Sequence, residues 1–406
     1  MTTSDLDPRL IADQPGLAGA WAAFRRRLSQ GELGNLPVIV GIAIIWVIFY
    51  IANPNFLTPA NLTNLILQIT AMGTIAVGIV LVLLLGEIDL SVGAVSGLAA
   101  AVMAVLNVKN GVPGWLAVLA ALATGAVIGL FQGFWVTRFR IPAFVVTLAG
   151  YLAWTGALLL VLGSTGTVNL ADAFIVGLAN TFFIPLDAWL FAIVATAGYA
   201  AVKLLERRRR AAAGLPVAPM RMIITRVVVI GLGLAATAAV LSADRGLPLA
   251  LVIFGSLIVL VDLLIRRTRF GRHVLAVGGN DEAARRAGID VSNVRMMVFV
   301  LATTLAAAGG VLAGSRLFAV NQASGASDLL LNAIAAAVIG GTSLFGGRGS
   351  AWSALLGALV IGSISNGMDL LGVASSTKFM VTGGVLLLAA TVDALSRRGR
   401  QAHGRA

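Results

Sequence analysis

Twelve apolar segments, each 17 to 24 residues long, constrain the fold of this chain more than any other feature. A helix of about 20 apolar residues crosses the hydrocarbon core of a bilayer. Segments of this length satisfy their backbone hydrogen bonds in lipid as helices. We therefore predict an all-α, polytopic transmembrane protein of about 10–12 spans, from segments 36–52, 62–85, 90–108, 115–136, 142–162, 188–204, 223–241, 248–265, 296–316, 329–346, 352–371 and 376–395.

Composition narrows the functional class. Hydrophobic residues make up 59% of the sequence and charged residues only 11%, and the mean hydropathy is +0.96. Cysteine is absent, which excludes disulfides and thiolate metal sites. The two histidines, His273 and His403, lie far apart in polar segments. We accordingly expect no metal site, no cofactor and no catalytic residue.

The distribution of basic residues predicts the orientation of the spans. If the N-terminus is inside and the spans alternate, 25 of the 29 lysines and arginines fall in inner segments or at inner helix ends. This asymmetry is the positive-inside pattern and predicts that both termini are cytoplasmic. The net charge of +12 then reflects topology and not a nucleic-acid partner, with membrane lipids as the incidental partner.

The polar stretches divide the chain into regions. Residues 1–35 form a predicted cytoplasmic segment with an amphipathic helix or a disordered tail, and residues 36–396 form the transmembrane domain. Within that domain, residues 204–222 are a basic cytoplasmic insert and residues 266–295 a polar cytoplasmic loop. Residues 397–406 are a predicted cytoplasmic tail.

The loop at 266–295 contains a short helix whose two ends are both marked in the sequence. Asn280 is the expected N-cap, Asp281 and Glu282 suit the positive end of the helix dipole, and Gly288 suits the left-handed position after the C-terminus. Isolated helices below roughly 12 residues are marginal in water. We expect this helix to dock on a partner; a solvated loop with one helical turn is the plainer alternative.

A break between helices is predicted at the motif Gly86-Glu87-Ile88-Asp89-Leu90-Ser91-Val92-Gly93. An aspartate at mid-bilayer costs about 2.5–3.5 kcal/mol on the insertion scale, so a helix break is the cheaper place for these carboxylates. We expect Asp89 or Ser91 to cap the next helix. Proton coupling through Glu87 or Asp89 is the alternative.

A related break follows 254 residues later, and includes Gly340, Gly341 and Thr342. Both breaks come after an apolar run and before a helix of small residues. Corresponding glycine-interrupted segments indicate a transporter built from two related halves, with the pathway near their interface. Chance similarity in a glycine-rich and alanine-rich sequence is the alternative. Asn366, in a late span, either faces the pathway or bonds a neighbouring helix.

Four stretches, in this order, resemble the sugar permeases of bacterial ATP-binding-cassette (ABC) importers, of the ribose and xylose type. They are GEIDLSVGAVSG at 86–97, RIPAFVVTLAG at 140–150, AVGGNDEAARRAGIDVSNVRMMVFVLA at 276–302 and GGTSLFGGRGS at 340–350. In that family the EAA…G helix docks on the ATPase subunit, which here corresponds to Glu282, Ala283, Ala284 and Gly288.

The resemblance implies a permease fold like that of the vitamin-B12 and ribose importers, in the bacterial inner membrane. It also implies three protein partners: an ABC ATPase subunit, a periplasmic sugar-binding protein and a second permease chain. The extra pair of spans at 188–204 and 223–241 suggests the longer, xylose-type members.

No lysine completes a P-loop, so this chain cannot hydrolyse ATP by that route, and in a transporter of the suggested kind the ATPase is a separate chain. We therefore predict a non-enzymatic transport subunit. An ion-coupled secondary transporter is the alternative, and a membrane enzyme is a third class for which no catalytic constellation is evident.

Overall fold

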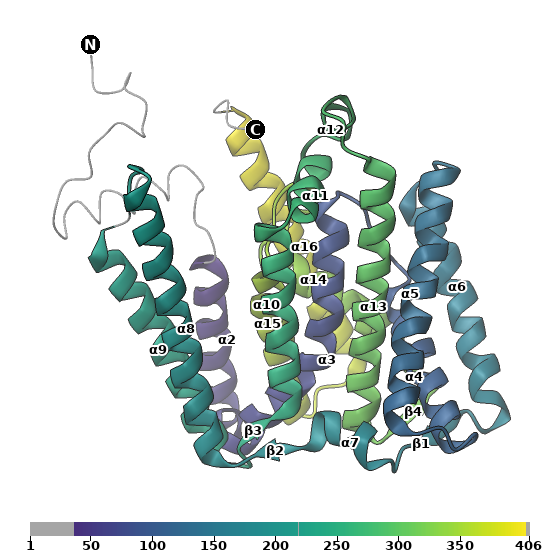
Figure 1. Ribbon diagram of the computed structural model, residues 1–406. Coiled ribbons are helices and arrows are strands. Elements are labelled where there is room, and N and C mark those ends of the chain that lie inside the picture. Colours follow the sequence, from purple (N-terminus) through teal and green to yellow (C-terminus); the bar gives the residue numbers. More distant parts are fainter. Residues whose placement is uncertain (1–35, 218, 403–406) are drawn as a thin grey trace.

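A bundle of helices running between two opposite faces makes up the protein (Figure 1). The computed structural model describes residues 36–217 and 219–402. Its helices are α2 (Leu36–Ala52), η1 (Pro54–Leu57), α3 (Pro59–Leu84), α4 (Val92–Val108), α5 (Gly114–Arg138), α6 (Ala143–Leu162), η2 (Gly163–Thr165), α7 (Ala173–Asn180), α8 (Pro185–Ala212), α9 (Met220–Ser242), α10 (Leu249–Arg267), α11 (Arg269–Gly279), α12 (Asp281–Arg286), α13 (Val291–Leu317), α14 (Ser327–Ile339), α15 (Ala351–Leu370) and α16 (Ser375–Ala402).

Each of the twelve apolar segments overlaps one of these helices, which confirms the all-α polytopic class. Among the described residues, eight helices are long and apolar enough to cross a membrane, and the apolar parts of α2, α4, α14 and α16 are shorter. The predicted span 329–346 is too long, because α14 stops at Ile339. Helix α16 continues to Ala402, so the described part of the predicted tail at 397–406 is helical. The amphipathic helix expected within 1–35 lies outside the described residues.

Four short strands lie on the face opposite α12 (Figure 1). They pair as two antiparallel ladders, β1 with β4 and β2 with β3. Both ladders join segments far apart in the sequence. Their bounds are β1 (Thr167–Asn169), β2 (Phe182–Phe183), β3 (Leu247–Pro248) and β4 (Ala319–Asn321).

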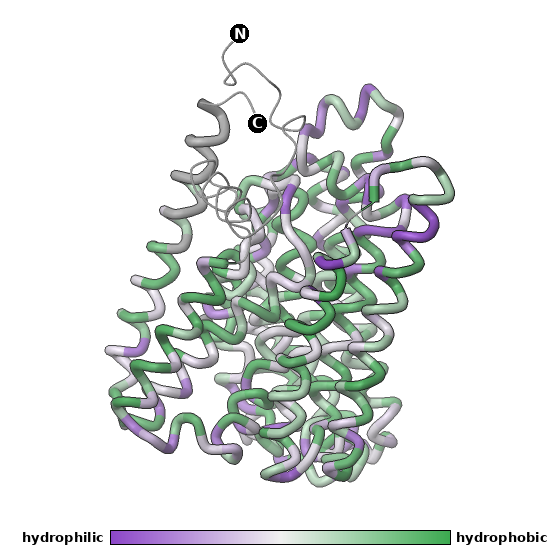
Figure 2. Tube along the Cα trace, turned by 90° about the vertical axis from the view of Figure 1, so that its left-hand side faces the viewer, coloured by the Kyte–Doolittle hydropathy of each residue, from purple (hydrophilic) through white to green (hydrophobic). Residues whose placement is uncertain are grey.

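The two faces differ in what they carry. Helix α12, the turn between α8 and α9, and the described C-terminal end of α16 lie on one face, and α7 and the strands lie on the other (Figure 1). Hydrophobic segments fill the middle of the bundle, and hydrophilic segments gather towards its two ends (Figure 2). This arrangement matches a protein surrounded by lipid along its length.

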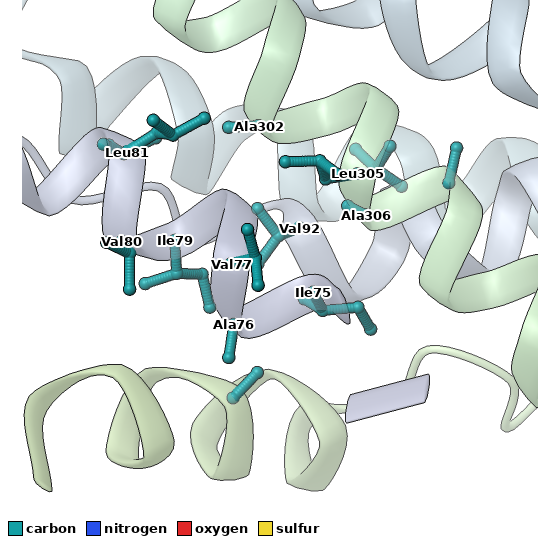
Figure 3. Close-up of a cluster of buried hydrophobic side chains, with 14 of the residues drawn as sticks. Ile75, Ala76, Val77, Ile79, Val80, Leu81, Val92, Ala302, Leu305 and Ala306 are labelled. Carbon is teal, nitrogen blue, oxygen red and sulfur yellow. The ribbon is translucent and has the colours of Figure 1, made fainter. Parts of the chain in front are cut away.

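The core is built on α3, which is almost wholly buried. Its apolar side chains, such as Ile75 and Ile79, pack near Ala302 and Leu305 of α13 (Figure 3). Glycines let the helix backbones touch, as small residues do in membrane bundles. A Cβ atom on Gly310 of α13 would lie 2.0 Å from the carbonyl oxygen of Ser96 in α4.

Helices α8 and α9 form a peripheral pair at one edge of the bundle (Figure 1). They pack on each other, and the apolar stretch of each is mostly exposed. This is the pair of spans that the sequence marks as additional to a ten-span body. Helix α8 continues through its four arginines to Ala212, so the first part of the basic insert at 204–222 is helical.

Candidate functional site

The short helix predicted in the polar loop is present as α12, with the predicted ends. The side chain of Asn280 accepts a hydrogen bond of 2.8 Å from the amide of Ala283. Asp281 and Glu282 occupy the first turn, and Arg285 and Arg286 the last. Gly288 has the left-handed φ of 82°. The caps and charges therefore act as the sequence indicates.

One side of α12 is attached to the protein and the other is free. Ala284 is buried and belongs to the main core cluster. Glu282 and Arg286 pair with each other, and their side chains are about three-quarters exposed, at 75% and 77%. An exposed i,i+4 pair contributes little to stability, so the two side chains can exchange this contact for one with another protein at little cost.

Arg295, near the start of α13, joins α12 to the first helix break. Its Nη2 atom lies 3.3 Å from Oε1 of Glu87 and 3.3 Å from Oδ2 of Asp281. All three side chains are partly buried, so these contacts are less screened than surface pairs. Burial raises the pKa of the Glu87 carboxyl above its usual value; Arg295 opposes this rise, and Asp281 adds to it. One guanidinium thus holds two carboxylates from separate segments.

The two predicted helix breaks meet each other beneath the polar loop. The amide of Gly347 donates a hydrogen bond of 2.9 Å to the carbonyl oxygen of Leu84, at the end of α3. A Cβ on Gly346 would lie 2.9 Å from the amide nitrogen of Gly86 and 2.6 Å from the carbonyl oxygen of Gly278. Gly278 belongs to α11, which directly precedes α12. We call this meeting point, made by Gly86, Gly278, Gly346 and Gly347, the glycine junction.

The predicted capping at the first break is wrong in its details. Helix α4 begins at Val92 with Ser91 in the N-cap position, and the Ser91 side chain accepts no hydrogen bond from the helix. Instead, Oδ1 of Asp89 accepts bonds of 2.8 Å and 2.7 Å from the amide and hydroxyl of Ser91. Gln132 of α5 donates to the same hydroxyl at 2.7 Å. Ser91 has helical backbone angles, so its hydroxyl bonds to Asp89 and Gln132 instead of folding back over the helix end.

Two of the other predicted break residues lie at close backbone contacts with neighbouring segments. A Cβ on Gly93 would lie 2.8 Å from the carbonyl oxygen of Gly325, and one on Gly340 would lie 1.8 Å from that of Ser353. Gly341 has a φ of 105°. Thr342 is buried, and its hydroxyl has no hydrogen-bond partner within the described part of the chain. Gly340, Gly341 and Thr342 thus shape the second break, whereas Gly93 belongs to the first. That the two halves are related remains a prediction.

Asn366 of α15 packs against another helix. It is buried and exchanges two hydrogen bonds, of 2.8 Å and 3.1 Å, with Asn61 of α3. Of the two alternatives left by the sequence, the structure thus supports helix packing over pathway lining.

Three parts of this site were not predicted from the sequence: α11, the ion pair of Arg295 with Glu87, and the hydrogen bond from Gln132 to Ser91. A signal for α11 exists, because Thr268 caps the helix through a 3.1 Å bond from the amide of Gly271. The other two parts have no local signal. Their partners are far apart along the chain.

A bundle of apolar helices with a short capped polar helix on one face is the fold of a polytopic membrane protein, and its family follows from similarity to known proteins. Residues 61–390 match the family described as branched-chain amino acid transport system / permease component. The chain belongs to this family of membrane permeases. No solved structure shows a significant match to the chain.

Curated relatives confirm the resemblance to ribose- and xylose-type permeases. The xylose transport system permease protein of Haemophilus influenzae is 34% identical over 373 residues, 92% of this chain and 99% of the relative. The corresponding protein of Escherichia coli K12 is 34% identical, over 90% and 93% of the two chains. The ribose import permease protein of Bacillus subtilis is 32% identical, over 90% and 94%.

Proposed function

We propose that this chain is the membrane-spanning subunit of an ABC importer that carries a monosaccharide across the bacterial inner membrane. A separate ATPase subunit binds α12, a periplasmic sugar-binding protein docks on the opposite face, and two permease chains pair. The observation that carries this proposal is α12 itself. It is a capped helix with an exposed outer surface, and its inner side is joined through Arg295 to Glu87 at the first helix break.

Xylose is the first candidate for the substrate, and ribose or a galactose-type sugar follows. Two kinds of relative support this order, because the xylose permeases are 34% identical to this chain and the ribose permease of Bacillus subtilis 32%. The peripheral pair α8 and α9 adds the extra length expected of xylose-type members. Uptake of labelled xylose and ribose by cells that express the complete transporter compares the two sugars directly.

The face that carries α12 is proposed to be cytoplasmic, with both termini on that side. The support is the charge pattern, since the arginines of the basic insert, of the loop at 266–295 and of residues 397–406 all fall on one side of the alternating spans. A reporter fused after Gly288 should therefore give an inside signal. An outside signal would contradict both the orientation and the docking assignment.

Closure of the ATPase is proposed to act on the spans through two contacts. Asp281 of α12 and Arg295 of α13 lead to Glu87, and Gly278 of α11 leads to Gly346 at the second break. Both contacts end where a membrane helix is interrupted. Interrupted helices are the places where transporters rearrange around their substrate pathway.

The outer surface of α12 is tested by combining Glu282→Lys with Gly288→Val. The first change reverses the charge of an exposed side chain, and the second places a β-branched residue at a left-handed position, at a cost of roughly 1–2 kcal/mol. We expect about tenfold weaker ATPase association, measured by co-purification, and a matching loss of sugar uptake. Membrane insertion and docking of the binding protein should be retained.

The matched control combines Glu206→Lys with Gly214→Val. Glu206 is also a paired glutamate, and Gly214 has a φ of 67° in the turn between α8 and α9. Both substitutions therefore repeat the chemistry on the same face, within the peripheral pair. This control should co-purify with the ATPase like the wild type. If the test pair also does so, α12 is not the docking helix.

An ion-coupled secondary transporter is the second candidate, and one observation favours it. Asp89 is buried, and its Oδ2 atom has no hydrogen-bond partner among the described residues. A buried carboxyl within a transporter is a candidate for carrying a proton. The same side chain also holds Ser91 in place, which is a purely structural role.

Substitutions of Asp89 separate these two functions. In Asp89→Asn the amide oxygen still accepts both bonds from Ser91, so uptake by the ABC importer should stay near wild type, with a stability loss of about 1 kcal/mol or less. Asp89→Leu removes the acceptor and should cost about 1–3 kcal/mol. Thermal unfolding and sugar uptake are the measurements. Complete loss of uptake in a stable Asp89→Asn protein would favour proton coupling.

A further inference from the structure

A polar cavity of about 170 Å³ lies beside α12, between the end of α5, the connection to α6 and the start of α13. Four arginines from these separate segments converge on it. Neither the docking surface of α12 nor the glycine junction includes it. Its lining residues are Val136, Thr137, Arg138, Arg140, Arg285, Ser292 and Arg295.

The charge in this cavity is only partly balanced. Arg285 pairs with Asp281 at 3.2 Å, and Arg295 pairs with Asp281 and Glu87. Arg138 and Arg140 form no ion pair with any of the residues that the structure describes, and both are exposed. Four guanidinium groups thus face two carboxylates, and the cavity has an excess of positive charge.

Exposed aromatic rings surround the same end of α5. The rings of Trp135 and Phe139 stack with their centroids 4.7 Å apart, and Phe134 meets both rings edge-on. Phe131, one turn earlier, lies 6.1 Å from Trp135. Each of these four side chains is at least one-third exposed. Tryptophan at the end of a spanning helix is typical of the lipid headgroup level, so Trp135 places this end of α5 there.

We propose that this cavity binds the phosphate of an anionic phospholipid headgroup. Arginine guanidinium groups bind phosphate oxygens through paired, charge-assisted hydrogen bonds. Basic pockets between membrane helices on the cytoplasmic side are suited to anionic headgroups. The volume is below the roughly 300–1,000 Å³ of sites that enclose a whole small molecule. It fits a headgroup whose acyl chains lie outside, against the aromatic rings.

A lipid at this site would connect the spans to the polar loop. Arg138 and Arg140 belong to the α5–α6 end of the cavity, whereas Arg285 belongs to α12 and Arg295 to α13. One phosphate shared by these groups would hold α12 against the bundle. The site requires only a membrane-embedded chain and does not depend on the identity of the transported sugar or of the ATPase.

The test measures lipid retained by the purified full-length chain, with native mass spectrometry after exchange into phosphatidylglycerol or phosphatidylcholine. We expect the wild type to retain phosphatidylglycerol selectively. Arg138→Gln combined with Arg140→Gln should weaken its retention about tenfold or more, because each arginine near an anionic surface contributes about a fivefold factor in affinity and the two factors multiply. Higher salt should reduce the wild-type binding in the same direction.

The matched control is Arg221→Gln combined with Arg226→Gln. Both arginines lie on α9, are exposed and are remote from the cavity, and the control removes the same charge from the chain. It should retain phosphatidylglycerol like the wild type. Equal loss in both double variants would mean that net charge alone attracts the lipid, and would overturn the proposal.

Two further outcomes would also overturn it. In the first outcome, the wild type in phosphatidylcholine binds inorganic phosphate, the Arg138 and Arg140 variant does not, and neither protein retains phosphatidylglycerol selectively. The cavity would then be a site for free phosphate. If the variant keeps its phosphatidylglycerol but no longer co-purifies with the ATPase, the arginines form a protein-docking surface. Folding of every variant is checked by its gel-filtration profile and thermal unfolding.

Discussion

Replacing Gly278 with alanine is expected to disable the protein, because the glycine junction has no room for a side chain. A Cβ atom at this position would lie 1.7 Å from the carbonyl oxygen of Leu84 and 2.8 Å from the amide nitrogen of Gly347. Both neighbours are backbone, so the helices themselves must separate. We expect a loss of about 3 kcal/mol in stability, the upper end of typical overpacking, and loss of sugar uptake. Thermal unfolding of the purified protein and transport assays measure the two effects.

Gly279 offers a control at the adjacent position. It lies in the same helix, and a Cβ there would meet nothing within 4 Å. Gly279→Ala should therefore leave both unfolding temperature and uptake near wild type. If Gly278→Ala behaved like Gly279→Ala, the close approach of α11 to the end of α3 would be disproved.

The second large effect is expected from Arg295→Leu. This change removes the cation shared by Glu87 and Asp281. The two partly buried carboxylates then repel each other with no guanidinium between them. Breaking a fully buried ion pair lowers stability by about 3–5 kcal/mol. Because these side chains are 20–37% exposed, we expect a smaller loss, of about 2 kcal/mol in the free energy of unfolding. The inner side of α12 should loosen. Faster amide hydrogen exchange in residues 280–290 and loss of uptake are the expected readings.

Two further variants separate positioning by Arg295 from general destabilisation. Arg295→Lys keeps the charge but loses the planar guanidinium that places Nη2 between the two carboxylates, so uptake should be restored only in part. Arg269→Leu removes an exposed arginine of α11 that forms no ion pair with the residues that the structure describes, and it should leave exchange in residues 280–290 unchanged. Normal exchange in this loop of the Arg295→Leu protein would show that α12 is held by other contacts.

The two substitutions act on different contacts between the same pair of regions. Gly278 controls how closely α11 can approach the breaks, whereas Arg295 controls the attachment of α12. Both should impair uptake, but only Arg295→Leu should leave the helix junction itself intact. Comparison of their unfolding temperatures therefore indicates whether transport depends on the junction, on the attachment of α12, or on both.

Local signals made several elements predictable. Every apolar segment is a helix because length and hydrophobicity alone determine that a span in lipid is helical. The ends of α12 follow from Asn280 and Gly288, whose effects reach only a few residues. The end of α14 at Ile339 could be read from the glycines that follow it, yet the apolar pattern through Phe345 extended the predicted span too far.

Tertiary structure alone decided what these elements meet. Glu87 and Arg295 are 208 positions apart, and Asn61 and Asn366 are 305 apart, so no local pattern relates them. Gln132, from another helix, reaches the hydroxyl of Ser91, a contact that no local pattern predicts. The four arginines of the cavity are visible in the sequence only as separate charges. Apolar length and capping are properties of neighbouring residues, whereas junctions, ion pairs and cavities depend on how the finished helices pack.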